Sequence, residues 1–190
     1  DATFMIDDQY APLTPKIKAA IAAISDKPVK FVLNTHWHGD HTGGNKDMGE
    51  AGALIIAHDN VRKRMSTTQV NAFFKSTTPA SPPVALPVVT FNDGVTFYLN
   101  GDTIRAIHVN PAHTDGDAVI HFVHANVLHM GDTYFNGSYP FIDASSGGSF
   151  DGYVTVANQA LAMVNDQTKI IPRHGPLSNK PEPPVWPDTL

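Results

Sequence analysis

Short apolar runs alternate with stretches of helical spacing in the first half of the chain. Residues 2–7, 31–33 and 53–57 are apolar runs of strand length, and the last two predict buried strands. Thr14-Pro15, followed by isoleucines at 17, 21 and 24, predicts an amphipathic helix capped by Thr14. Further helices are predicted over 46–51, 60–65 and 69–75. This order of elements predicts an α/β fold.

The second half is richer in β-like runs. Four of them occupy residues 95–99, 103–109, 118–123 and 127–130, and Asn100-Gly101 is a good hairpin turn between the first two. Residues 153–164 then predict a helix with Val156, Ala160 and Met163 inward, and residues 169–172 a last strand. Prolines between 78 and 87 predict an ordered irregular loop, and five more between 176 and 190 predict an irregular tail over 177–190.

Composition narrows the class of protein. The chain has 190 residues, of which 42% are hydrophobic and 16% charged, so we expect one domain over residues 1–190. A net charge of −5 argues against nucleic acid as a partner, and no apolar run reaches the roughly 18 residues of a membrane span. Cysteine is absent, which excludes thiolate ligands and nucleophiles. We expect a soluble protein, and the composition does not distinguish the cytoplasm from the periplasm or the exterior.

The most specific local signal is the loop His36-Trp37-His38-Gly39-Asp40-His41. Side chains two residues apart in an extended segment share one side, so His36 and His38 can hold one metal ion. Gly39 and residues 42–45 supply a bend that brings in His41, with Thr42 or Asn45 as candidate helix caps. Imidazole together with carboxylate suits Zn²⁺, and also Fe or Mn. The loop therefore predicts a metal site.

Three more metal-capable residues each follow an apolar strand, beside glycine or proline. They are His113, Asp132 and His174, and each is a weak signal alone. Thr114, Asp115 and Asp117 could orient ligand imidazoles or form a turn. Trp37 and Tyr134 could bind substrate at the wall of the site or pack below it. The remaining histidines lack the flanking pattern and are interpreted as structural: His58, His108, His121, His124 and His129.

The loop His36-x-His38-x-Asp40-His41, followed in order by His113, Asp132 and His174, resembles the dinuclear site of the metallo-β-lactamase superfamily. The resemblance implies an αββα sandwich of two mixed β-sheets flanked by helices. It implies that His36, His38 and His113 bind one metal, that Asp40, His41 and His174 bind the second, and that Asp132 bridges them.

The chain departs from the family pattern at its two ends. Family members usually have about two more strands before the segment that begins at Asp1, which predicts an incomplete first sheet whose exposed edge favours homo-oligomers. Arg173 stands where glycine is common, and Pro181, Pro183, Pro184 and Pro187 preclude the usual final helix. We therefore expect a truncated or altered member of the family.

The resemblance implies a hydrolase with two Zn²⁺ ions per chain, acting on a small-molecule carboxyl derivative: a β-lactam, lactone, thioester or amide. Asp40 is the candidate for proton transfer, because a bridging Asp132 has its lone pairs engaged. Aspartate at 132 resembles the lactonases and glyoxalase II-like thioesterases, since dedicated β-lactamases usually have cysteine or serine there. The alternatives are an iron-dependent dioxygenase of the same fold, an RNA phosphodiesterase, which the acidic composition disfavours, and a non-catalytic metal-binding remnant.

Overall fold

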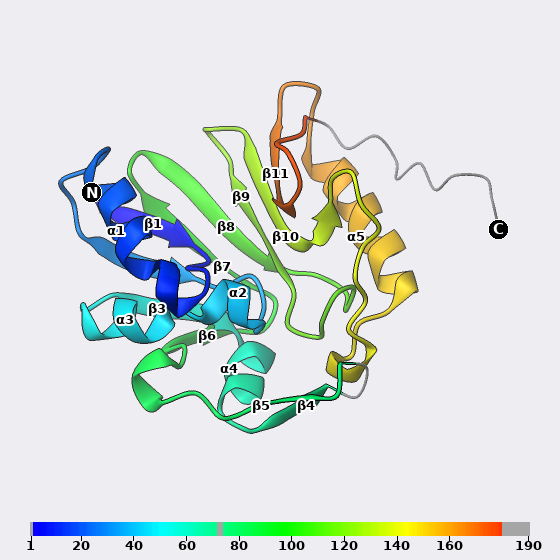
Figure 1. The fold of residues 1–190 in the computed structure, drawn as a ribbon. Helices are drawn as coiled ribbons and strands as arrows, with labels where there is room; N and C mark the ends of the chain where they lie inside the picture. Colours follow the sequence, from blue (N-terminus) through cyan, green and yellow to red (C-terminus); the bar gives the residue numbers. More distant parts are fainter. Residues whose placement is uncertain (1, 72–73, 180–190) are drawn as a thin grey trace.

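The computed structural model describes residues 2–71 and 74–179, and it arranges them in two main sheets with helices on the outer faces (Figure 1). The first sheet has the strand order β1-β2-β3-β6, and all three pairings are parallel. Its strands are β1 (Thr3–Ile6), β2 (Val29–Leu33), β3 (Leu54–His58) and β6 (Val89–Phe91). Because neighbouring strands run the same way, the carboxyl ends of β1 and β2 meet at one end of the sheet.

The second sheet has the order β11-β10-β9-β8-β7, with β10 and β11 parallel and the other pairs antiparallel. Its strands are β7 (Gly94–Leu99), β8 (Asp102–His108), β9 (Ala118–Phe122), β10 (Val127–Phe135) and β11 (Lys169–His174). The helices are α1 (Thr14–Ala22), α2 (Gly39–Thr42), α3 (Asn45–Glu50), α4 (Asp59–Met65) and α5 (Phe150–Met163), with short 3₁₀ turns at Ala11–Leu13, Pro83–Ala85 and Ala144–Ser146.

Strands of the first sheet have consecutive apolar residues because successive side chains point to opposite faces and both faces are covered. On β2, Val32 packs outward with Met48 of α3, whereas Leu33 packs inward against the second sheet, beside Ile104 and Ile120. A separate cluster joins the outer face of the second sheet to α5. It comprises Val109, Ala112, Val119, Leu128, Met130, Tyr153, Val156, Ala160 and Ile170. The layers therefore run helix, sheet, sheet, helix, which is the expected αββα order.

Most predicted elements are confirmed, and a few are wrong. Residues 69–75 form no helix: β4 (Gln69–Asn71) pairs antiparallel with β5 (Ser76–Thr78). Strand β6 was not predicted, and the first sheet is parallel throughout its described strands rather than mixed. A 3₁₀ turn lies inside the proline-rich loop.

The predicted helix caps are also wrong. Leu13 precedes α1 at the cap position, so Thr14 is its first residue, and Ile24 lies beyond its end. His38 and Gly44, rather than Thr42 and Asn45, occupy the N-cap positions of α2 and α3, and neither helix has a side-chain capping hydrogen bond. The Asn45 side chain instead exchanges hydrogen bonds with Asn34, at 2.9 and 3.1 Å.

The two ends of the chain bear on the remaining predictions. Strand β1 lies at the edge of the first sheet among the described strands, so self-association through that edge stays a prediction. Of the predicted irregular tail, residues 180–190 lie outside the described residues, while Ser178 forms a β-bridge with Ile170. Within the described ranges, no helix combines the length and the apolar composition that crossing a bilayer requires.

Candidate metal centre

The carboxyl ends of several strands bring the predicted ligands to one end of the sandwich. The histidine loop follows β2, His113 lies between β8 and β9, Asp132 lies within β10, and His174 ends β11. Gly131 allows the close approach of β10: its φ is +53°, and a Cβ there would lie 2.8 Å from the Thr35 side chain. The sandwich therefore gathers side chains that are up to 138 positions apart in the sequence.

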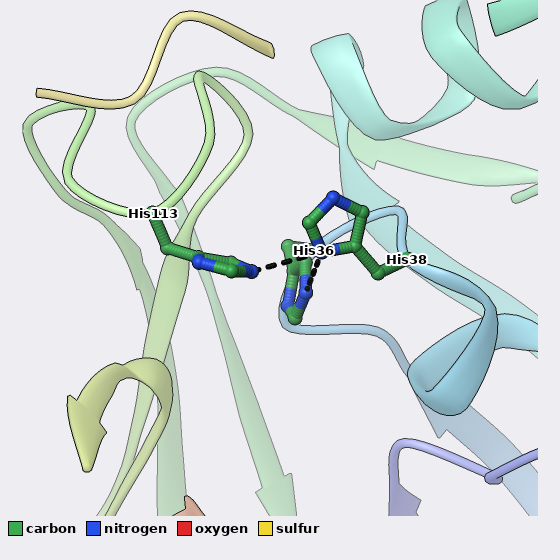
Figure 2. Close-up of side chains that lie close together, drawn as sticks. All are labelled: His36, His38 and His113. Atoms are coloured by element: carbon green, nitrogen blue, oxygen red, sulfur yellow. Dashed lines mark hydrogen bonds between the residues drawn. The ribbon is translucent and has the colours of Figure 1, made fainter. Parts of the chain in front are cut away.

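Three imidazoles form the first group of ligands. His38 Nδ1 lies 3.1 Å from His36 Nε2 and 2.8 Å from His113 Nε2. Figure 2 shows the three rings turned toward one another, with His113 reaching across from the second sheet. His36 and His113 are almost fully buried. Three nitrogens that converge in this way match the imidazole ligands of a zinc or iron site.

Two carboxylates and two imidazoles form the second group. His41 Nε2 lies 3.3 Å from Asp40 Oδ2 and 3.2 Å from Asp132 Oδ1. His174 Nε2 lies 3.5 Å from Asp40 Oδ2 and 3.3 Å from Asp132 Oδ2. Asp132 Oδ2 also lies 3.5 Å from His113 Nε2 in the first group. Asp132 therefore stands between the two groups, where a bridging ligand would be.

The donor set fits metal ions. His41 Nε2 and Asp132 Oδ1 are buried, face the cluster, and have no hydrogen-bond partner among the described residues. Burial lowers the pKa of His113 to about 4, and burial together with the charge of neighbouring imidazoles holds the pKa of His36 far below its usual value. Both rings are therefore neutral at pH 7, which is the state that binds metal.

The carboxylates of the second group stay ionised. Burial alone would raise the pKa of Asp40 and Asp132, but the adjacent His41 imidazole lowers both below the ordinary value. Burial likewise opposes protonation of His41, and the carboxylates of Asp7, Asp132 and Asp40 raise its pKa overall. The second group thus carries the negative charge that would attract a second cation.

Each buried imidazole is held by its other ring nitrogen. His41 Nδ1 donates to Asp7 Oδ2 at 2.8 Å, and His36 Nδ1 lies 3.1 Å from the Thr35 hydroxyl, which in turn donates to Asp7. His113 Nδ1 donates to the Phe141 carbonyl at 2.6 Å. Such contacts fix the nitrogen that faces the metal and increase its basicity. The rings are therefore oriented before any ion binds.

His38 depends on Asp143 in the loop after β10. Its Nε2 donates to Asp143 Oδ2 at 2.9 Å, and the Ser146 hydroxyl donates to the same oxygen at 2.6 Å. The Trp37 indole N–H then donates to Ser146 Oγ at 3.1 Å. This chain of hydrogen bonds joins the histidine loop to the second sheet.

Two orienting carboxylates, Asp7 and Asp143, were not predicted from the sequence. Asp7 directly follows β1, which is parallel to β2, so its position beside the histidine loop could have been found from the strand pairing. Asp143 does not follow an apolar strand beside glycine or proline, so no sequence pattern marks it. The predicted orienting residues have other roles: Asp117 accepts the backbone N–H groups of Ala112, His113 and Thr114, and Asp115 pairs with Arg64 at 2.7 Å.

The two aromatic side chains proposed as substrate contacts are engaged elsewhere. Trp37 is buried with Ala57, Val61, Met65 and Leu86. The Tyr134 hydroxyl donates to Ser178 Oγ at 3.3 Å, and its ring packs against the cluster under α5. These contacts favour a packing role for both. The histidines interpreted as structural lie outside both ligand groups, and His58 stacks on His108 with ring centroids 3.7 Å apart.

Arg173 does not displace its neighbour His174 from the cluster. Its Nη2 donates to the main-chain carbonyl of Asp40 at 2.7 Å, and its guanidinium also contacts the Gln9 side chain. Arg173 therefore connects β11 to α2, two of the elements that carry ligands of the second group.

Asp8, next to Asp7, provides a prediction about pH. It is fully buried, its Oδ1 accepts the Gly44 N–H at 2.9 Å, and its Oδ2 has no partner among the described residues. Burial, opposed by that hydrogen bond and reinforced by Asp7, raises its pKa from 3.8 to about 8. The folded chain thus keeps a proton that the unfolded chain releases near pH 4. The free energy of unfolding of the metal-free protein should therefore fall between about pH 4 and pH 8.

Replacing Asp8 removes this loss of stability. At pH 8 the metal-free Asp8→Asn variant should be more stable than the parent by several kcal/mol, since one pKa unit corresponds to about 1.4 kcal/mol. Near pH 4 the two should be similar. Urea unfolding at both pH values measures this, with the exposed Asp26→Asn as control. A variant that is less stable at pH 8 would contradict the prediction.

Comparisons with known proteins agree with this architecture. The sequence profile described as the metallo-beta-lactamase superfamily matches residues 5–174. The lactamase-like protein aptB of Emericella nidulans is 29% identical over 138 residues, which is 73% of this chain and 38% of that protein. The hydroxyacylglutathione hydrolase of Erythrobacter litoralis is 32% identical over 108 residues, or 56% of this chain and 35% of that protein. The chain thus spans little more than a third of these relatives.

Solved structures show the same fold. A metallo-beta-lactamase from Pontibacter korlensis superposes with a TM-score of 0.75 at 18% identity, covering 94% of this chain and 77% of that one. TTHA1623, solved in a di-iron-bound form, gives a TM-score of 0.70 at 23% identity, covering 92% of this chain and 83% of that one.

Proposed function

Because the chain belongs to the metallo-β-lactamase superfamily, we propose that it is a hydrolase that uses two zinc ions to cleave a carboxyl derivative. The observation that carries this proposal is the pair of adjacent ligand groups with Asp132 between them. His36, His38 and His113 would hold the first ion, and Asp40, His41 and His174 the second. Zinc bound there would acidify a water molecule and polarise a substrate carbonyl.

Asp40 is the proposed proton acceptor in this reaction. Its side chain is 20% exposed, whereas Asp132 is 5% exposed and directs both oxygens at ligand imidazoles. A carboxylate at the open side of the cluster can reach the substrate and its leaving group, and a fully engaged one cannot. The pKa of Asp40 lies below its ordinary value, so the carboxylate is ionised at neutral pH, which is the form that a proton acceptor requires. The same low pKa makes it a weak base, so its position rather than its basicity supports this role.

Among carboxyl derivatives, we propose thioesters first. One curated relative is a hydroxyacylglutathione hydrolase, and aspartate rather than cysteine or serine occupies position 132. The solved β-lactamases are too distant in sequence to support more than the fold. β-Lactam and lactone cleavage are tested beside the thioesters.

Chelation of the metal provides the direct test. Zinc-loaded protein is assayed with S-acyl thioesters, acyl homoserine lactones and nitrocefin, before and after treatment with a chelator. We expect turnover of at least one substrate, a loss of more than about 100-fold on chelation, and recovery when zinc is restored. Turnover that survives chelation would exclude the mechanism. Full zinc occupancy without any turnover would favour a non-catalytic metal-binding domain.

Iron is the second candidate metal. The same imidazole and carboxylate donors suit iron, and one protein of this fold has been solved with two irons. Metal analysis of protein purified without added metal distinguishes the two ions. One iron per chain together with oxygen consumption would favour a dioxygenase over the hydrolase.

A further inference from the structure

Three phenylalanines from separate segments lie along one side of the ligand cluster. Phe135 ends β10, Phe141 lies in the loop that follows, and Phe74 lies just before β5. The Phe135 ring stacks on the His174 imidazole, with centroids 5.0 Å apart and planes 12° apart. The Phe141 ring meets His113 edge-on at 5.7 Å, and Phe74 meets Phe141 at 5.3 Å. These three rings are called the aromatic wall below.

The aromatic wall borders the open side of the cluster. His174 is 44% exposed, the most of the seven ligands for which an exposure is given, and Phe135 stacks directly on it. Phe135 and Phe141 are half-buried, and Phe74 is 59% exposed. Large apolar side chains at the mouth of a polar site are unfavourable in water unless a ligand covers them. Substrate sites commonly combine such an apolar surface with a few polar groups.

The position of the aromatic wall is fixed by backbone contacts. The Phe141 carbonyl accepts hydrogen bonds from His113 Nδ1 and from the Tyr153 hydroxyl, at 2.6 and 2.9 Å. The Asn136 N–H, next to Phe135, donates to the His174 carbonyl at 2.9 Å. Both rings are thus held in place relative to the ligands beside them, and a group resting on them would sit at a set distance from the reacting carbonyl.

From this geometry we propose that the aromatic wall binds the acyl group of the substrate and selects a bulky apolar, preferably aromatic, acyl chain. The proposal rests on the proposed hydrolase function, since it assigns a substrate class to that same site. An aryl ring can stack on Phe141 and Phe74 while its carbonyl lies at the ligand cluster. A short acyl group such as acetyl leaves the wall uncovered.

The test compares acetyl and phenylacetyl thioesters of one thiol. We expect zinc-loaded parent protein to show a kcat/KM at least tenfold higher for the phenylacetyl ester. Phe74→Ala and Phe135→Leu should each reduce that preference severalfold, mainly by raising KM for the phenylacetyl ester. Tyr98→Ala, an 83% exposed aromatic on β7, is the control and should leave the preference unchanged. Zinc content is measured for every variant, because Phe135 touches His174.

A binding measurement separates this proposal from the hydrolase function. Phenylacetate should bind the zinc-loaded parent protein at least tenfold more tightly than acetate in calorimetric titrations, and Phe74→Ala should reduce the difference. If phenylacetate is preferred but no thioester, lactone or nitrocefin is cleaved, the proposal for the aromatic wall is supported and the hydrolase proposal fails. Equal binding of the two acids, or equal kcat/KM for the two esters, overturns the aromatic wall whether or not the protein is a hydrolase.

Discussion

Asp132→Asn is expected to lower kcat/KM at least about a thousandfold, equivalent to about 4 kcal/mol of transition-state stabilisation. Asp132 lies within reach of both ligand groups, with Oδ2 3.5 Å from His113 Nε2 and 3.3 Å from His174 Nε2. An amide keeps the shape but loses the negative charge and one metal-binding oxygen. We expect fewer than two zinc ions per chain, measured by elemental analysis of dialysed protein.

The control for this prediction is Asp26→Asn. Asp26 has the same chemistry but is 86% exposed, and its recorded partner is the adjacent Lys27. It should retain full zinc content and activity. Near-UV circular dichroism of both variants should match the parent, because the asparagine fills the same volume. An Asp132→Asn variant that binds two zinc ions and turns over at the parent rate would show that Asp132 does not bridge the groups.

Strands with two buried faces could be predicted from the sequence, because every residue in such a strand tends to be apolar and the run is visible without knowledge of the tertiary structure. Val32 and Leu33, or Ile55 and Ile56, are adjacent apolar residues that pack in opposite directions, and polar residues are excluded from both sides. The segment that forms β4 and β5 offers no such signal. Val70 and Phe74 are largely exposed, so no buried face selects helix or strand, and the antiparallel pairing of the two short strands with each other decides the conformation.

The ligands themselves were easier to predict than the groups that orient them. The residue type of a metal ligand indicates its chemistry directly, and the loop from His36 to His41 contains four metal-capable residues. Asp7 and Asp143 are ordinary aspartates in sequence, 34 and 105 positions from the histidines they hold. The parallel pairing Ile6↔Leu33 carries Asp7 to His41, and the loop after β10 carries Asp143 to His38. Their function depends on tertiary structure, which short sequence patterns do not contain.

Asp7 directly holds His41 of the second group and reaches His36 of the first group only through the Thr35 hydroxyl, whereas Asp143 directly holds His38 of the first group. Their substitutions should therefore affect mainly different ions. Asp143→Ala leaves His38 Nε2 without its acceptor and should weaken zinc binding at the first group by about 10- to 100-fold. Asp7→Asn should do the same at the second group, because an amide nitrogen in place of Oδ2 cannot accept the His41 Nδ1 proton. Competition titration with a chromophoric chelator resolves the two affinities.

Measuring the free energy of unfolding of each variant distinguishes a carboxylate that orients one ligand imidazole from one that supports the whole fold. Asp7→Ala should destabilise the protein by about 2–4 kcal/mol, because it leaves both the buried Thr35 N–H and the His41 ring nitrogen without a hydrogen-bond acceptor. Asp7→Asn retains an oxygen for Thr35 and should lose less stability while losing the same zinc affinity. Two outcomes would contradict this prediction. In one, both Asp7 variants lose zinc affinity only in proportion to their loss of stability. In the other, the Asp7 and Asp143 variants weaken zinc binding equally at both ligand groups, which would mean that each carboxylate supports the whole fold rather than one ligand.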